Sequence, residues 1–169
     1  MASGILLLRL VLGGTLAAHG SQKLFGAFGG GGLGGTSGWL RSMGFRAPGF
    51  MALLVALSEF GGGALFAAGL LTPLGALGIA SAMFVAVATV HVKNGFFSGA
   101  NGYEFNLLIW AGAVAVSATG AGRFSLDRAF GWDGSFAGYR WGIGVAVASV
   151  VLGLLTIAVG RGPAPAQSS

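Results

Sequence analysis

Six ionisable side chains lie within or beside apolar segments of this sequence and could do chemistry: Arg9, His19, Lys23, Glu59, His91 and Glu104. Histidine changes its charge near neutral pH, and a carboxylate inside an apolar segment is suited to proton transfer. Histidine and lysine also donate hydrogen bonds to carbonyl oxygens. This combination favours an amphipathic ligand that carries carbonyl oxygens, or proton transfer coupled to such a ligand.

Glu59 is the only ionisable residue in the apolar run 50–71, which is long enough to cross the hydrocarbon core of a bilayer. It stands eleven residues after Pro48, which places it roughly 16 Å into a helix that begins there. A carboxylate at that depth is costly, so it must face a partner or a wet cavity, or be protonated. The sequence leaves open whether Glu59 belongs to a buried ion pair that only packs the bundle or is a functional carboxylate.

The composition identifies the class of protein. Hydrophobic residues make up 54% of the 169 residues and charged residues only 8%, against about 25% charged in soluble domains. We therefore predict an integral protein of the cell membrane. The nine lysines and arginines, which give a net charge of +5, are assigned to loops that meet lipid headgroups rather than to nucleic-acid binding. With no cysteine, disulfides and thiolate metal sites are excluded.

The apolar runs predict an all-α, polytopic membrane bundle with a four-helix core and a fifth, C-terminal transmembrane helix. The expected segments are a core over 1–128 with helices at about 4–25, 48–70, 73–92 and 104–119, an interfacial linker at 129–140, the fifth helix at 141–159 and a disordered tail at 160–169.

Two further segments need interpretation. We expect the first helix to be retained rather than cleaved as a signal peptide, because no basic region precedes it and Arg9 interrupts its apolar run. The glycine-rich segment 26–47 is expected to be a flexible connection. It is not a phosphate-binding loop, because no strand precedes it and no Gly-Lys-Ser/Thr follows it.

Alternating crossings bring the polar residues toward one side of the bundle, here called the far face, opposite the N-terminus. The first helix carries His19 and Lys23 to the far face, the third carries His91 there, and the fourth begins there with Glu104. These four residues are expected to line a pocket at the far face.

Glu59 reaches mid-depth from the second helix, and we expect Arg9 to form a buried charge pair with it.

Each member of this set has a simpler interpretation. Glu104 could only cap its helix, His91 could be an ordinary interfacial histidine, and Lys23 could extend to the headgroups from a helix end. The two histidines and two carboxylates could also ligate a metal. We expect no metal, because the Glu-x-x-His spacing of di-iron helix bundles is absent.

The order of these residues resembles the DoxX family of small bacterial and archaeal membrane proteins. The shared features are an early Arg9, His19-Gly20-Ser21-Gln22-Lys23, Glu59-Phe60-Gly61-Gly62 with the Leu71-Thr72-Pro73 turn, His91, Glu104, and Gly122-Arg123-Phe124-Ser125-Leu126-Asp127. The resemblance covers about residues 5–128. It implies a four-helix membrane core and an association with respiratory or sulfur redox chemistry, including a subunit of a thiosulfate–quinone oxidoreductase and a membrane complex with superoxide dismutase and a sulfurtransferase.

We therefore predict a membrane protein associated with redox chemistry that binds a quinone-like ligand, as a quinone-interacting oxidoreductase subunit. The predicted catalytic residues are Glu59, His91 and Glu104, and the predicted ligand-binding residues are Arg9, His19 and Lys23. Membrane lipid, a quinone and a soluble redox protein are the expected partners. Two alternatives stay open: a non-catalytic subunit or scaffold for a soluble redox enzyme, and a small transporter or proton pathway.

Overall fold

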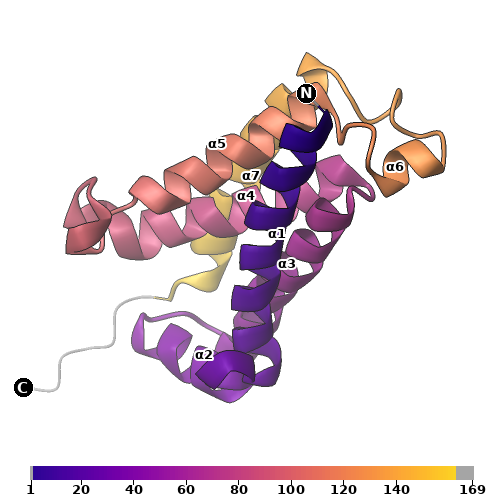
Figure 1. The fold of residues 1–169 in the computed structure, drawn as a ribbon. Helices are drawn as coiled ribbons and strands as arrows, with labels where there is room; N and C mark the ends of the chain where they lie inside the picture. Colours follow the sequence, from indigo (N-terminus) through magenta and orange to yellow (C-terminus); the bar gives the residue numbers. More distant parts are fainter. Residues whose placement is uncertain (1, 163–169) are drawn as a thin grey trace, which may run out of the picture.

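The computed structural model describes residues 2–162, which form helices without a named strand (Figure 1). The α-helices are α1 (Ala2–Phe25), α2 (Gly32–Ser42), α3 (Pro48–Ala68), α4 (Thr72–Ala86), α5 (Glu104–Thr119), α6 (Leu126–Ala129) and α7 (Tyr139–Gly160). A π-helical segment, η2 (Val87–His91), continues α4, and short 3₁₀ segments are η1 (Ala27–Gly29), η3 (Val92–Asn94) and η4 (Ser98–Ala100).

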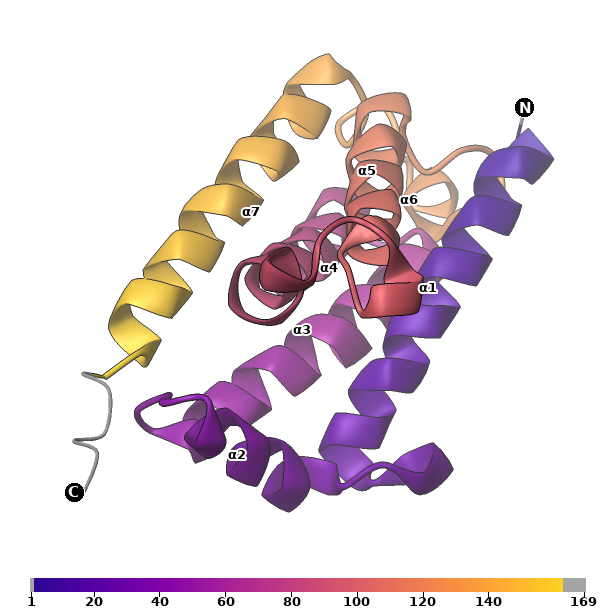
Figure 2. The same cartoon turned by 90° about the vertical axis from the view of Figure 1, so that its left-hand side faces the viewer.

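The predicted polytopic helical bundle is confirmed. Four helical segments are long and apolar enough to cross a membrane: Ala2–Phe25, Pro48–Ala68, Thr72–Asn94 and Tyr139–Gly160. Helix α5 is apolar but has 16 residues, which gives it a length of about 24 Å, less than the ~30 Å hydrocarbon core. Figure 2 shows α1 and α7 on opposite sides of the bundle, with α4 and α5 between them.

Helices α1 and α3 pack with their backbones in near contact, because glycines occupy the crossing. A Cβ atom on Gly13 would lie 2.6 Å from the Gly63 carbonyl oxygen, and one on Gly20 would lie 2.2 Å from the Phe60 nitrogen. Small residues allow this close approach inside membranes. The contacts also fix the antiparallel register: Gly13 lies against Ala67, and Gly20 against Phe60.

Helix α4 is at the centre of the bundle and contacts α3, α5 and α7. The main apolar core is formed by fully buried side chains from α1, α3, α4 and α5, among them Leu16, Phe66, Ile79 and Val116. The indole of Trp110 on α5 donates a hydrogen bond of 3.0 Å to Ser149 on α7, so that α7 is attached by a polar contact as well as by apolar packing.

The prediction of a flexible connection over residues 26–47 is wrong, because much of this segment is helical. Helix α2 forms although glycine disfavours helices. Tertiary packing compensates for this low propensity: Leu40 and Phe45 are buried against Ala52 of α3.

The prediction of a disordered tail over residues 160–169 is wrong for its first three residues. An isolated antiparallel bridge joins Phe45 to Arg161, with hydrogen bonds from the Arg46 nitrogen to the Gly160 oxygen at 2.6 Å and from the Gly162 nitrogen to the Gly44 oxygen at 3.1 Å. Residues 160–162 are therefore ordered against the α2–α3 connection, and the rest of the predicted tail lies outside the described residues.

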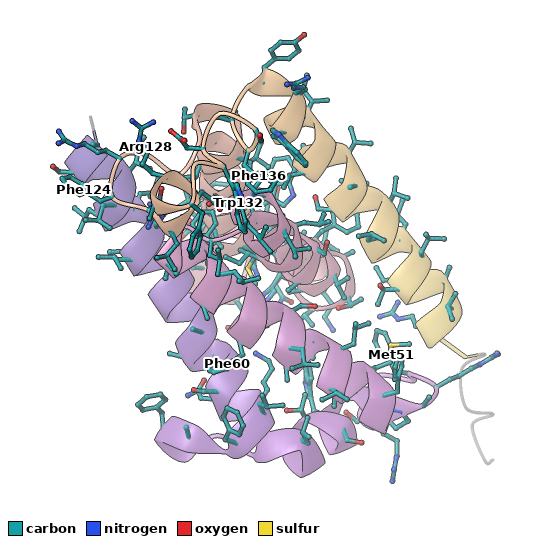
Figure 3. All side chains as sticks on the ribbon, turned by 90° about the vertical axis from the view of Figure 1, so that its right-hand side faces the viewer. Met51, Phe60, Phe124, Arg128, Trp132 and Phe136 are labelled. Atoms are coloured by element: carbon teal, nitrogen blue, oxygen red, sulfur yellow. The ribbon has the colours of Figure 1, made fainter. Side chains whose placement is uncertain are left out.

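The predicted interfacial linker, 129–140, carries a row of aromatic side chains after α6. The rings of Trp132 and Phe136 lie 6.2 Å apart and nearly perpendicular, and Figure 3 shows both on the side of the molecule where α7 begins. Met51 lies at the opposite end of α7 in the same view. Its placement agrees with the space around Gly160, where an added Cβ atom would lie 3.3 Å from the Met51 methyl group.

Candidate functional site

A cavity of about 460 Å³ lies between α1, α2, α3, α4 with η2, and α5, and Thr156 of α7 also lines it. This volume falls within the range of small-molecule sites. Most of its wall is apolar. Its polar lining includes His19, Lys23, Ser58, Glu59, Ser81, Thr89, His91 and Asn106. The structure therefore brings four of the six predicted site residues to one cavity, whereas Arg9 and Glu104 do not line it.

Glu59 is paired with Lys23, whose Nζ donates a hydrogen bond to Glu59 Oε2. The Glu59 side chain is 7% exposed and that of Lys23 is 25% exposed. The predicted pairing of Glu59 with Arg9 is wrong. The antiparallel register of α1 on α3 explains why, since Gly20 meets Phe60 and places Lys23, one turn further on, beside Glu59.

Arg9 lies near the opposite end of the bundle and is 1% exposed. Its guanidinium donates to four backbone carbonyls: Phe66 at 3.1 Å, Ala67 at 2.9 Å, Phe124 at 3.1 Å, and Ala121. It thus caps the C-terminal end of α3, whose last carbonyls lack partners within the helix, and ties that end to the segment before α6.

Asp127 is a buried residue whose role the sequence interpretation missed. It is fully buried, and its carboxylate accepts hydrogen bonds from the Leu71 nitrogen at 2.7 Å, the Thr72 nitrogen at 3.0 Å and Thr72 Oγ1 at 2.6 Å. An acid at a helix N-terminus satisfies free N–H groups and favours the helix dipole. Two sequence features point to this role of Asp127: the Gly-x-x-Ser-Leu-Asp motif that it ends, and the Thr72-Pro73 pair that begins α4.

His91 ends the π-helical segment and lines the cavity with Thr89 and Val90. Its Nδ1 lies 2.8 Å from the Asn101 carbonyl oxygen. Because a carbonyl can only accept, Nδ1 carries the hydrogen, and Nε2 is the remaining acceptor of the neutral ring. Single π turns inside α-helices occur often at functional sites.

Glu104 stands at the start of α5 outside the cavity. Its carboxylate accepts a hydrogen bond from Ser98 Oγ, and its nitrogen donates to the Phe96 carbonyl at 3.0 Å. Helix α5 begins after Tyr103 without a side-chain cap. Glu104 therefore stabilises the loop between η3 and α5.

His19 faces the cavity, and within residues 2–162 its ring has no hydrogen-bond partner. In the same described range, no three His, Asp or Glu side chains form a group that could hold a metal ion. The arrangement thus offers one free imidazole, a second imidazole with a fixed tautomer and a lysine–glutamate pair around a mainly apolar space. Such a site can donate hydrogen bonds to ligand oxygens and exchange protons with them.

Known proteins resemble this chain over most of the bundle. A family model described as DoxX matches residues 4–92. The chain is 34% identical over 127 residues to "Inner membrane protein YqjF" of Escherichia coli (strain K12), which covers 74% of this chain and 90% of that relative. It is 32% identical over 124 residues to "Putative oxidoreductase CatD" of Bacillus subtilis (strain 168), which covers 73% and 84%. No solved structure matches the chain significantly.

Proposed function

Because the chain belongs to the DoxX family and is a multi-pass protein of the plasma membrane, we propose that its cavity binds the headgroup of a quinone-like ligand in the service of membrane redox chemistry. The observation that carries this proposal is the cavity itself, where His19, His91 and the Lys23–Glu59 pair face a mainly apolar space. A quinone has the matching chemistry: carbonyl oxygens on an apolar ring with an apolar tail.

The lining can hold such a headgroup through its donors. Lys23 retains ammonium hydrogens beyond the one given to Glu59, and the His19 ring has no partner among the described residues. A hydrogen bond from a charged donor to a carbonyl oxygen contributes about 1.5–3 kcal/mol. The apolar wall would accommodate the ring and the start of the tail.

Reduction of a quinone to a quinol consumes two electrons and two protons. Glu59 and His91 are the lining groups suited to pass these protons from the aqueous side to the ring, because a carboxylate and the Nε2 of a neutral imidazole can each take up a proton and hand it on. The electrons would come from a partner redox protein. The name of the Bacillus relative, an oxidoreductase, supports a redox context.

The proposal is tested by mass spectrometry of lipids extracted from the purified protein. We expect menaquinone or ubiquinone close to one per chain in the wild type. His19→Ala should lower its occupancy about tenfold to a hundredfold, as expected for the loss of a strong hydrogen bond to a carbonyl oxygen. His91→Ala should lower the occupancy of the reduced form, because the Nε2 of His91 accepts a hydrogen bond from a quinol hydroxyl. Lys93→Ala is the matched control, because Lys93 is an exposed cation beside His91 that does not line the cavity. Absence of quinone from the wild type, or equal occupancy in all variants, would refute the proposal.

A second function, as a non-catalytic membrane subunit for a soluble redox enzyme, is favoured by one observation. Lys23 and Glu59 neutralise each other, so neither charge requires a ligand, and the pair joins α1 to α3. This alternative predicts stable co-purification with a redox enzyme and no bound quinone. It also predicts that His19→Ala leaves the amount of co-purified enzyme unchanged.

A further inference from the structure

The loop 95–103, which joins η3 to α5, is closed by hydrogen bonds of its own. Figure 1 shows it at the end of the bundle where α4 and α5 are joined. Three backbone nitrogens donate across it: Tyr103 to the Gly95 oxygen at 3.2 Å, Glu104 to the Phe96 oxygen at 3.0 Å, and Gly102 to the Phe97 oxygen at 3.0 Å. The Ser98 hydroxyl adds a fourth bond, to the Glu104 carboxylate. The loop is therefore a defined structure that can hold a neighbouring side chain in place.

Asn101 is the loop residue that meets the cavity histidine. Its backbone is left-handed, with φ 60° and ψ 27°, a conformation that asparagine adopts more readily than most residues other than glycine. In this conformation the Asn101 carbonyl accepts hydrogen bonds from His91 Nδ1 at 2.8 Å and from Asn94 Nδ2 at 3.1 Å. One loop carbonyl thus orients the His91 ring.

This bond decides which edge of the His91 ring is left for the cavity. His91 lines the cavity and Asn101 does not, so the Nδ1 edge faces the loop and the opposite edge, which carries Nε2, is left for a ligand. Within residues 2–162, Nε2 has no hydrogen-bond partner. A neutral imidazole that donates through Nδ1 can only accept at Nε2. His91 therefore offers the cavity an acceptor, whereas the ammonium group of Lys23 offers a donor.

We propose that Asn101 is a positioning residue, which holds His91 as a hydrogen-bond acceptor and so makes the cavity prefer the reduced form of its ligand. This inference rests on the proposed quinone-type ligand and specifies the oxidation state that is bound more tightly. A quinol hydroxyl can donate to Nε2, and a quinol oxygen can still accept from Lys23. A quinone carbonyl can only accept, so the oxidised form leaves Nε2 without a donor.

The tautomer of His91 is measured first, in the full-length protein without ligand, by nitrogen NMR of isotopically labelled histidine at alkaline pH. The chain has two histidines, so His19→Ala assigns the signals. We expect the wild-type His91 ring in the form that carries its hydrogen on Nδ1. Gly102→Ala should displace the loop, because a Cβ there would lie 2.4 Å from the Gly95 oxygen and 2.5 Å from the Phe96 oxygen, both backbone atoms. His91 should then shift toward the form with its hydrogen on Nε2.

Gly99→Ala is the matched control, because Gly99 lies in the same loop and a Cβ there would meet nothing within 4 Å. It should keep the wild-type tautomer. A second pair of variants acts on Asn101 and decides the question if Gly102→Ala does not fold. Asn101→Val disfavours the positive φ and should shift the tautomer, whereas Asn101→Gly permits this conformation and retains the carbonyl, and should behave as the wild type.

Binding of the two oxidation states is then compared without oxygen, with decylubiquinol and decylubiquinone as probes. Trp39 lines the cavity, so binding is followed by quenching of tryptophan fluorescence, with Trp39→Phe identifying the signal from the cavity. We expect the wild type to bind the quinol about threefold to tenfold more tightly than the quinone, as expected for one additional hydrogen bond. Gly102→Ala and Asn101→Val should raise the Kd for the quinol to that for the quinone and leave the latter unchanged.

The outcomes separate this inference from the proposed function. If the wild type binds neither probe, the proposed function fails. If it binds both equally, the preference for the reduced form is wrong while the ligand site stands. Loop variants that keep both the wild-type tautomer and the preference would refute the positioning role of Asn101. An equal rise in the Kd for both probes would also overturn it, because it would show general damage to the cavity.

Discussion

The Lys23–Glu59 pair can be broken from either side, and removing the lysine should lower the free energy of unfolding more than removing the charge of the glutamate. Lys23→Met leaves a carboxylate that is only 7% exposed without its partner, and removal of one member of a buried pair costs about 3–5 kcal/mol. Because Lys23 is itself 25% exposed, solvent reduces this effect, and we expect a loss of about 2–3 kcal/mol in the free energy of unfolding. Glu59→Gln should cost less, about 1 kcal/mol, since the lysine can extend toward the far-face headgroups.

The double variant Lys23→Met/Glu59→Gln should be more stable than Lys23→Met alone, by about 1–2 kcal/mol, because it leaves no unpaired charge. Arg9 provides the comparison. Its guanidinium bonds to backbone carbonyls and not to Glu59, so the effects of Arg9→Met and Glu59→Gln should add to within about 0.5 kcal/mol.

The assay is reversible unfolding in mixed detergent micelles, followed by circular dichroism, for the single and double variants of both cycles. A Lys23/Glu59 double variant no more stable than Lys23→Met would refute the pairing. Strong coupling between Arg9 and Glu59 would refute the register of α1 on α3 from which the pairing follows.

Three further predictions concern the rest of the bundle. Asp127→Ala should lower the free energy of unfolding by about 2–4 kcal/mol, because it leaves the buried donors at the start of α4 without an acceptor, and chemical denaturation would measure the loss. Gly20→Val should prevent stable folding, seen as loss of the monodisperse peak in size-exclusion chromatography, because the Cβ would lie 2.2 Å from the Phe60 nitrogen; Gly14→Ala, where a Cβ meets nothing within 4 Å, is the control and should fold. Reporter fusions at Ala2 and after Gly162 should report opposite sides of the membrane, and the same side for both would contradict five crossings.

Much of the architecture could be predicted because apolar runs and their lengths suffice to locate membrane helices. The gathering of His19, Lys23 and His91 at one end also follows from alternating crossings alone. The partner of Glu59 could not be predicted in this way. Helical periodicity places Arg9 and Lys23 on the same face of α1, and only the register of α1 on α3, set by glycine contacts such as that of Gly20, decides which cation meets the carboxylate.

The other differences also arise from tertiary contacts. Composition argues against a helix over Gly32–Ser42, but burial of Leu40 beneath α3 stabilises it. Asp127 stands in a polar segment, where an acid is usually solvated. Its role depends on a tertiary contact: the N-cap residue of α4 makes no side-chain hydrogen bond, and the Asp127 carboxylate accepts from the Thr72 nitrogen instead.

The hydrogen bonds of Arg9 have a consequence for biosynthesis. Its partners are carbonyls 57 to 115 residues later in the chain. At a synthesis rate of about 5–20 residues per second, the nascent chain carries an arginine without its final partners for roughly 6–23 s. During that time α1 holds a cation that its own helix cannot satisfy. The short stretch after α5 thus has a part in membrane insertion, because translation must reach Phe124 before the first helix can settle at its final depth.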